Sequence, residues 1–201
     1  MTVGVPKLKT KISATEYLKD ELVRQTRHEF VSGEVYAMAG ANDRHHRIAA
    51  NLFTKLDAHL IGSNCDAFIT EIKVKVNEEL FYYPDVFVAC DKNPASAYYR
   101  EHPVLVIEVA SPSTRQTDRR EKLRAYQQMA DVLEYVLVEQ DKLHIELHRR
   151  QPDGTWITYF YNDNDLDVDI EFQSVGLKTN LDEIYDRVSF SGPKTNIEPS
   201  S

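Results

Sequence analysis

The chain has 201 residues, of which 42% are hydrophobic and 28% are charged, and its formal net charge is −8 at pH 7. A chain of this length forms one domain by default and can bury a hydrophobic core without disulfides or structural metal ions. No apolar run approaches the roughly 18 residues that cross a bilayer, and the basic start, MTVGVPKLKTK, has no apolar segment after it. We therefore expect a cytoplasmic protein with no signal peptide and no membrane partner.

The negative charge is unevenly distributed along the chain. Residues 151–201 contain ten acids and three bases, which gives −7 from the last quarter alone. Residues 114–130 instead contain five bases against two acids. The acidic total argues against a general nucleic-acid coat protein, but it leaves room for a local phosphate-binding face.

Two cysteines, Cys65 and Cys90, are too few for a disulfide framework or a cysteine zinc site. We expect both to be reduced and packed inside an intracellular protein.

The first part of the chain alternates helix and hairpin signals. After a loose arm over residues 1–12, the motif SATE has the spacing of a capping box and opens a helix over about residues 14–24. In HEFVSGEVYA, a Ser-Gly turn separates two β-prone runs and predicts a hairpin. Asn42 is the expected N-cap of a second helix, which reaches about residue 60 and has an apolar stripe.

From residue 67 the apolar period changes to two. FITEIKVKV predicts one strand, with Glu71, Lys73 and Lys75 on its outward side. FYYPDVFVAC predicts another strand, whose proline marks an edge, a bulge or a strand start. VLVIEVA has the continuous apolar character of a strand covered on both faces.

The remaining elements complete the expected architecture. A helix over residues 117–129 is followed by the strands EYVLVEQ, LHIELHRR and TWITYFY. Helices and hairpins thus precede a strand–helix–strand unit and a final β-meander, which is typical of an α+β or mixed α/β fold. We expect one domain over residues 13–188 and a disordered tail over residues 189–201.

Two acids lie inside apolar strands: Asp85 in YYPDVFV and Glu108 in VLVIEVA. A buried ionised carboxylate is costly unless a cation pairs with it. Either acid alone could pair with a buried arginine or lie at a hydrated sheet edge. On adjacent strands, about 4.8 Å apart, the two would repel unless a cation bridged them. Oxygen ligands of this kind suit Mg²⁺ or Mn²⁺.

Lys122 lies on the predicted helix that leaves the Glu108 strand. A lysine there could align or deprotonate a metal-bound water and stabilise charge at a phosphoryl group. Arg119 and Arg120 on the same helix are expected to contact phosphates. The alternative is that Lys122 is one base among several on a solvated helix face.

These residues resemble the Uma-type family of restriction endonucleases, small bacterial proteins of the PD-(D/E)XK superfamily. The resemblance covers roughly residues 13–185 and is carried by Pro84-Asp85, IEVASPST, Asp118 and Lys122 ahead of Tyr126, with GEVYAMAGAN, His45-His46 and EYVLVEQD. The superfamily pattern is Pro-Asp followed by Asp/Glu-x-Lys on the next strand. Here the lysine position is Ala110, so the resemblance implies a migrated lysine, with Lys122 as the substitute.

The resemblance implies a restriction-endonuclease-like α/β core, in which helices flank a mixed central sheet and a C-terminal β-meander follows. It implies a metal-dependent endonuclease that hydrolyses DNA, rather than RNA, and that often acts as a homodimer. Asp85, Glu108 and the Val109 carbonyl would hold Mg²⁺ or Mn²⁺, and Lys122 would position the attacking water. An early acid assists metal binding in parts of the superfamily, and Glu34 is the candidate here, although it could equally form a hairpin salt bridge.

Two other functions stay open. Ala110 is also consistent with a catalytically inactive module that kept the nuclease fold and binds nucleic acid or protein. The third candidate is a metal-dependent hydrolase of a small phosphoester, against which the basic helix and the lack of a phosphate-binding loop argue. His45 and His46 could line a cleft or cap the second helix, and a structural role is favoured for both.

Overall fold

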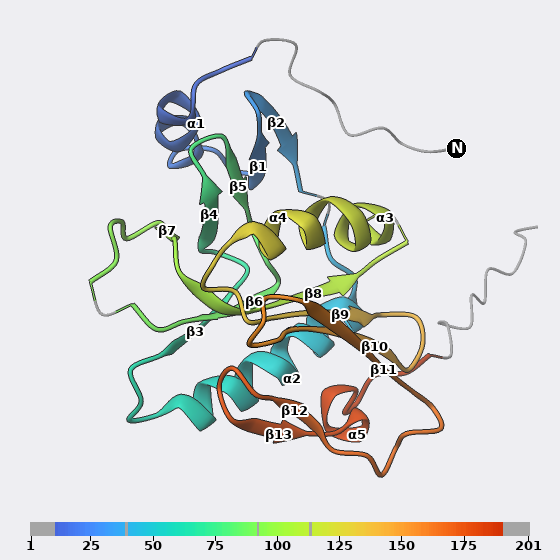
Figure 1. Ribbon diagram of the computed structural model, residues 1–201. Helices are drawn as coiled ribbons and strands as arrows, with labels where there is room; N and C mark the ends of the chain where they lie inside the picture. Colours follow the sequence, from blue (N-terminus) through green and yellow to red (C-terminus); the bar gives the residue numbers. More distant parts are fainter. Residues whose placement is uncertain (1–10, 39, 92, 113, 191–201) are drawn as a thin grey trace, which may run out of the picture.

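The structure, a computed structural model, describes residues 11–38, 40–91, 93–112 and 114–190. The strands in these ranges form a six-stranded sheet, a five-stranded sheet and a two-stranded ribbon (Figure 1). With helices on both sides of the larger sheet, this is the expected mixed α/β class. Within the same ranges, no helix has both the length and the apolar character that a transmembrane helix needs.

The six-stranded sheet contains the strand of Glu108 and the strand that follows Asp85. In spatial order its strands are β11 (Trp156–Asn162), β10 (His144–Arg150), β9 (Glu134–Glu139), β8 (Pro103–Ala110), β6 (Val86–Ala89) and β3 (Asp66–Ile69). β8 and β9 are parallel, and the other neighbouring pairs are antiparallel. The parallel pair requires a crossover connection. It consists of α3 (Arg115–Thr117), a π-helical turn η1 (Asp118–Lys122) and α4 (Leu123–Gln128).

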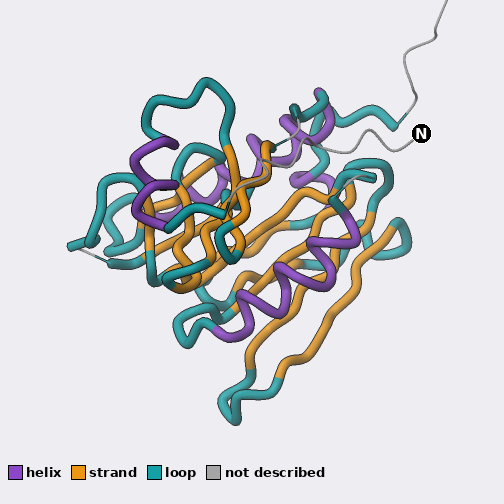
Figure 2. Tube along the Cα trace, turned by 90° about the horizontal axis from the view of Figure 1, so that it is seen from above, coloured by secondary structure: helices purple, strands orange, loops and turns teal. Residues whose placement is uncertain are grey.

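Side chains of β8 alternate between two helical layers. Leu105, Ile107 and Val109 belong to the core cluster that contains the apolar side of α2 (Asp43–Leu60). Val106 belongs to the cluster that contains α4. Because side chains alternate along a strand, Glu108 shares the face of Val106 and lies on the side of the crossover. Figure 1 shows this crossover and α2 on opposite sides of β8, and α2 is the longest helix in the view from above (Figure 2).

The five-stranded sheet forms a separate layer beside the crossover (Figure 1). In spatial order its strands are β2 (Glu34–Ala37), β1 (His28–Val31), β5 (Leu80–Tyr82), β4 (Lys73–Asn77) and β7 (Tyr99–Arg100). Helix α1 (Ala14–Glu21) packs on it through Tyr17, which stacks on Phe30. The predicted capping box of this helix and the hairpin of β1 and β2 are confirmed.

The last elements cover the α2 side of the large sheet. They are β12 (Ile170–Phe172), β13 (Leu177–Thr179) and α5 (Leu181–Ile184). Ile170, Phe172 and Ile184 are buried in the same cluster as α2. Of the expected arm and tail, most residues lie outside the described ranges. Within the arm, the Ile12 N–H donates to the Gly33 carbonyl at 2.9 Å, so this end is joined to the hairpin.

Two predicted strands are wrong in their extent. The segment predicted as one strand from Ala67 splits into β3 and β4, which belong to different sheets, and Thr70 between them has a φ of 47°. The segment predicted as 81–90 splits into β5 and β6 around Tyr83-Pro84-Asp85. As a result Lys73 is buried rather than outward-facing, and its Nζ lies 3.1 Å from the Tyr83 hydroxyl.

The expectation of two reduced cysteines is also wrong, because Cys65 and Cys90 form a disulfide. The antiparallel register of β3 and β6 pairs Asp66 with Ala89, so the two cysteines are the next residues out on adjacent strands. Counting cysteines in the sequence does not reveal this cross-strand neighbourhood.

Candidate functional site

The two candidate acids come together at the end of the β6–β8 ladder. The antiparallel register pairs Val86 with Ile107, and one step further it brings Asp85 opposite Glu108. Asp85 comes directly before the first residue of β6, and the Val109 N–H, next to Glu108, donates to the carboxylate of Asp85. Both residues are buried. The expectation that these two strands are neighbours is confirmed.

Lys122 lies against Glu108 rather than in solvent. Its Nζ is 3.0 Å from Glu108 Oε1, 2.9 Å from Glu29 Oε1 and 3.6 Å from Asp118 Oδ1. The side chain of Lys122 is only 8% exposed, and that of Glu108 only 4%. The ammonium also lies over the Tyr82 ring, 5.3 Å from its centroid. The alternative of a solvated lysine on an outer helix face is therefore excluded.

The π-helical turn η1 sets the direction of Lys122. The Leu123 N–H bonds to the Asp118 carbonyl, five residues back, and the Tyr135 hydroxyl donates to the same carbonyl at 3.0 Å. Asp118 and Lys122 are thereby both on the buried side of the turn, while Arg120 is exposed. Single π-helical turns are frequent at functional sites. No feature of the sequence had indicated this one.

Asp85 is held by one backbone donor and one side-chain donor. The Val109 N–H donates to Asp85 Oδ2 at 2.7 Å, and His45 Nε2 lies 3.2 Å from the same oxygen. His45 is in the first turn of α2, and its N–H is capped by the Asn42 side chain at 2.9 Å, as the sequence predicted for this helix start. The sequence favoured a structural role for His45 and did not predict its contact with Asp85.

Glu29 is the acid that the sequence did not single out. Its Oε1 contacts Lys122 and accepts a bond of 3.3 Å from the Tyr83 N–H. Glu34, the predicted early acid, is on the other strand of the same hairpin and accepts from the Tyr36 hydroxyl. Both are ordinary hairpin glutamates in the sequence, so nothing there distinguishes them. The role of Glu34 stays a prediction.

Burial and neighbouring charges shift the pKa values of the side chains in this cluster. Burial raises the pKa of Glu108 well above its ordinary value, although Lys122 opposes the shift. Burial likewise raises the pKa of Asp118. Burial alone would lower the pKa of Lys122, but Glu108, Glu29 and Asp118 raise it well above its ordinary value. The lysine therefore stays protonated, and the excess of acids over cations favours retention of a proton among them.

The pKa of His45 is also raised. Burial alone would lower it, but the hydrogen bond and the charge of Asp85 raise it above its ordinary value, with a further contribution from a backbone hydrogen bond to Val109.

The donor set suits a hard divalent cation. Carboxylate oxygens are the ligands that Mg²⁺ and Mn²⁺ prefer, and Asp118 Oδ1 is buried without a hydrogen-bond partner. No group of three or more histidine, cysteine, aspartate or glutamate side chains among the described residues is arranged to hold a metal ion. Mg²⁺ is commonly bound through one or two carboxylates and keeps several waters, so a three-residue cage is not required. The Asp85–Glu108 pair therefore fits such an ion.

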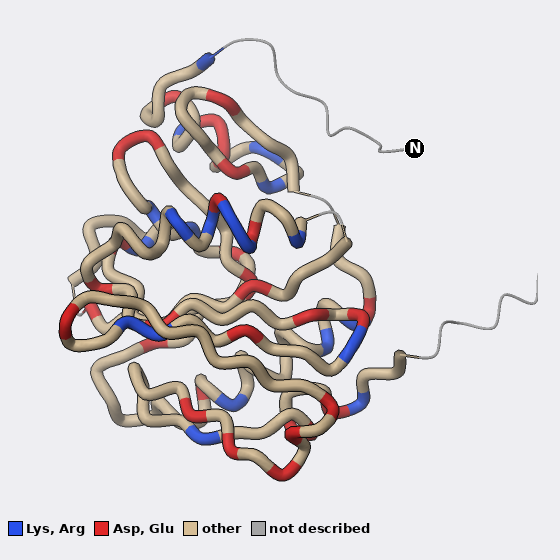
Figure 3. The backbone as a smooth tube through the Cα atoms, turned by 45° about the vertical axis from the view of Figure 1, so that its right-hand side comes forward, with Lys and Arg blue, Asp and Glu red and all other residues tan. Residues whose placement is uncertain are grey.

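The arginines of the crossover differ in their surroundings. Arg119 contacts Glu139 at 3.0 Å and Glu146 at 2.5 Å, and Arg115 shares Glu139 at 2.6 Å. These pairs attach the crossover to β9 and β10. Arg120 is exposed and has no ion-pair partner in the described part of the chain. Lysine and arginine positions recur along this crossover in Figure 3.

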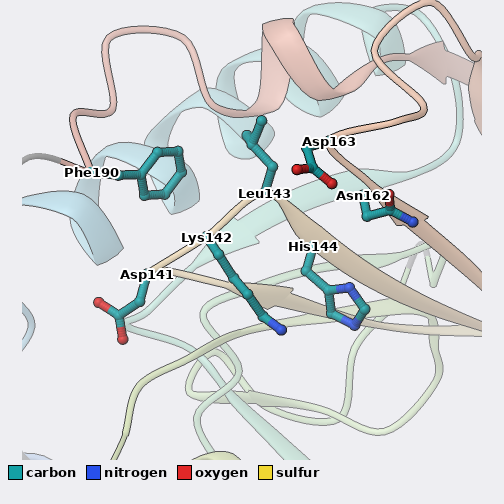
Figure 4. A pocket seen from close by; sticks show the side chains of 7 residues that line it. All are labelled: Asp141, Lys142, Leu143, His144, Asn162, Asp163 and Phe190. Carbon is teal, nitrogen blue, oxygen red and sulfur yellow. The ribbon is translucent and has the colours of Figure 1, made fainter.

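A surface hollow of about 400 Å³ lies apart from this cluster. It is lined by Asp141, Lys142, Leu143, His144, Asn162, Asp163 and Phe190 (Figure 4). None of the residues around Lys122 lines it, so it adds no group to the candidate site.

A mixed sheet with two acids from adjacent strands and a lysine beside them defines a restriction-endonuclease-like protein. The chain belongs to the Uma2 family, described as "Putative restriction endonuclease", which matches residues 14–181.

Similar proteins span nearly the whole chain. "Uncharacterized protein slr1290" of Synechocystis sp. is 35% identical over 182 residues, covering 90% of this chain and 94% of that protein. "Uncharacterized protein sll1609" of the same organism is 26% identical over 179 residues, with coverages of 87% and 99%. A crystal structure of "a putative nuclease belonging to DUF820" from Anabaena variabilis matches with a TM-score of 0.69 at 18% identity, covering 87% of this chain and 97% of that one. The last match supports the fold.

Proposed function

We propose that the protein is a metal-dependent endonuclease that hydrolyses phosphodiester bonds of DNA at Asp85, Glu108 and Lys122. The observation that carries the proposal is the 3.0 Å contact between Lys122 and Glu108, with Asp85 opposite Glu108 in the register. This contact supplies from the crossover the lysine that is missing at Ala110. Family membership and the nuclease named among the structural matches support the same function.

Each residue has a distinct role in this proposal. Asp85 and Glu108 would hold Mg²⁺ or Mn²⁺ together with the Val109 carbonyl. A bound divalent ion would polarise the scissile phosphate and lower the pKa of a water ligand. Since its pKa is raised, Lys122 acts as a charged hydrogen-bond donor that orients the water and stabilises negative charge, rather than as a base.

The DNA backbone would approach the exposed side of the crossover. Arg120 and Arg124 are exposed there and can contact phosphates. Arg119 is expected to contribute less than the sequence suggested, because its guanidinium is paired with Glu139 and Glu146. A homodimer and a cytoplasmic location stay predictions, the first to be checked by light scattering.

Cleavage of plasmid and single-stranded DNA with Mg²⁺ or Mn²⁺ tests the proposal. Asp85→Ala and Glu108→Ala should each lower the cleavage rate by about 100-fold or more, because each removes part of the charge stabilisation. Chelation of the metal should abolish cleavage by the wild type. Equal activity in the wild type and both variants would indicate a contaminant or a different site.

The second candidate is a catalytically inactive module that keeps the nuclease fold. The observation in its favour is that Lys122 is already paired with Glu108 and Glu29 and lies among the groups that would face a metal. Titration with Mn²⁺ by calorimetry separates the two functions. Binding that depends on Asp85 and Glu108 supports the enzyme, whereas DNA binding without such metal binding supports the module.

A further inference from the structure

We infer that His45 is a positioning residue of the candidate metal site, which it serves by holding the carboxylate of Asp85 in one orientation. The inference rests on the proposed function of Asp85 as a metal ligand. It adds a residue from α2, an element on the opposite side of the sheet from the crossover (Figure 1).

The contact geometry makes His45 a donor to Asp85. Its Nε2 lies 3.2 Å from Asp85 Oδ2, and an ionised carboxylate can only accept hydrogen bonds. The same oxygen accepts the Val109 N–H at 2.7 Å. Two donors on Oδ2 fix the carboxylate plane and leave Oδ1 as the oxygen without either of these bonds. A metal ligand is commonly oriented by such outer hydrogen bonds.

His45 and the Val109 N–H meet at the same oxygen of Asp85. Asp85 is therefore held from β8 by a backbone N–H and from α2 by the imidazole of His45. The side chain of His45 is only 15% exposed, so the contact is held inside the protein rather than at a mobile surface.

The local structure keeps His45 in place independently of its side chain. Its backbone N–H is capped by Asn42 Oδ1, and α2 continues for 18 residues with a buried apolar side. Replacing the imidazole should leave this helix intact, because alanine and glutamine are better helix formers than histidine. His46, the next residue, is exposed and provides a matched control.

The experiment measures Mg²⁺, Mn²⁺ and Co²⁺ affinity of the full chain by calorimetry. His45→Ala should weaken Mg²⁺ and Mn²⁺ binding by about 10–100-fold, the usual cost of losing an outer hydrogen-bond partner of a metal ligand. His45→Gln, which restores an N–H near the Nε2 position, should recover most of the loss. His46→Ala should match the wild type, and circular dichroism should show all variants folded.

Other outcomes overturn the inference in distinguishable ways. Wild-type affinity in folded His45→Ala, together with a loss in Asp85→Asn, would reject the role of His45 and keep the metal site. No metal binding by the wild type would reject the proposed function and this inference with it. A loss restricted to Co²⁺, with Mg²⁺ binding unchanged, would indicate a direct nitrogen ligand and reject the positioning role.

Discussion

At the scale of single residues, Lys122 is the group on which the cluster depends. It is a buried cation whose ammonium contacts Glu108 and Glu29 at 3.0 and 2.9 Å. A buried ion pair contributes little net stability over apolar packing, but removal of one partner leaves an unpaired buried charge. We therefore expect the lysine to contribute to stability as well as to the proposed chemistry.

Lys122→Met should lower the free energy of unfolding by about 3–5 kcal/mol, because the carboxylates around it lose their cation. Urea denaturation measures this loss. The double variant Lys122→Met/Glu108→Gln should be more stable than Lys122→Met alone. A loss below about 1 kcal/mol, the range of an exposed salt bridge, would contradict the buried cluster.

The raised pKa values of Glu108 and Asp118 predict the pH dependence of stability. Both groups titrate above their ordinary values of 4.5 and 3.8 in the folded state, so the folded protein binds more protons than the unfolded chain in that window. Their contribution to stability therefore falls as pH rises from about 4 through the folded pKa values. Glu108→Gln should make this fall shallower in urea denaturation from about pH 4 to 8. The exposed Glu121→Gln is the control, and equal slopes in the wild type and Glu108→Gln would contradict the prediction.

The residues of the site differ in how visible they are in the sequence. Asp85 and Glu108 could be singled out as candidates, since a single acid inside an apolar segment is conspicuous. Glu29 could not be predicted, because it looks like Glu34 and only the packing of β1 beside the crossover brings it to Lys122. The contact of His45 with Asp85 also joins elements that are far apart in the chain.

At the scale of elements, capping residues and apolar periodicity predicted an element correctly where the whole segment packs in one layer. Helix α2 begins and ends as its N-cap and apolar stripe indicate. The strands from Ala67 to Cys90 failed because the apolar period continues across breaks at Thr70 and Pro84, where the chain passes between the two sheets. Periodicity reports the burial of a face and not the sheet to which the strand belongs.

The two crossover arginines should differ in role: Arg119 should stabilise the fold, and Arg120 should contact DNA. Arg119→Ala should destabilise the protein by about 1–3 kcal/mol, since it removes charged hydrogen bonds to Glu139 and Glu146. Arg120→Ala should change stability by no more than about 0.5 kcal/mol. It should instead weaken DNA binding and reduce its salt dependence by about one phosphate contact.

Urea denaturation and fluorescence anisotropy of labelled DNA at several salt concentrations measure the two effects. The reverse pattern, with a stable Arg119→Ala that loses DNA affinity, would restore the phosphate contact that the sequence predicted for Arg119.

At the scale of the whole molecule, the Cys65–Cys90 disulfide connects the edge strand β3 to β6, the strand that follows Asp85. The bond spans a sequence separation of 25 residues. Closing a loop of this size stabilises a protein by about 3.5 kcal/mol in the chain-entropy description. Compartments that keep thiols reduced would remove this contribution.

Reduction of the wild type should therefore lower its thermal midpoint, whereas Cys65→Ser/Cys90→Ser should have the lower midpoint with or without reductant. Differential scanning calorimetry with and without dithiothreitol measures both, and alkylation followed by mass spectrometry reports the state of the thiols. An unchanged midpoint after complete reduction would show that the bond adds nothing to stability.

The π-helical turn has a consequence for how such a site can be adjusted. Asp85 and Glu108 are fixed to each other by strand register, in which a shift of one residue would reverse every side chain. Lys122 is instead carried by a helical turn, in which one inserted or deleted residue rotates the rest of the helix by roughly 100°. A change in the helical turn can therefore redirect the lysine side chain while the register of the acids stays the same. In the proposed site, the acids belong to the sheet and the lysine belongs to the helical turn, so the part that must stay rigid is separate from the part that can vary.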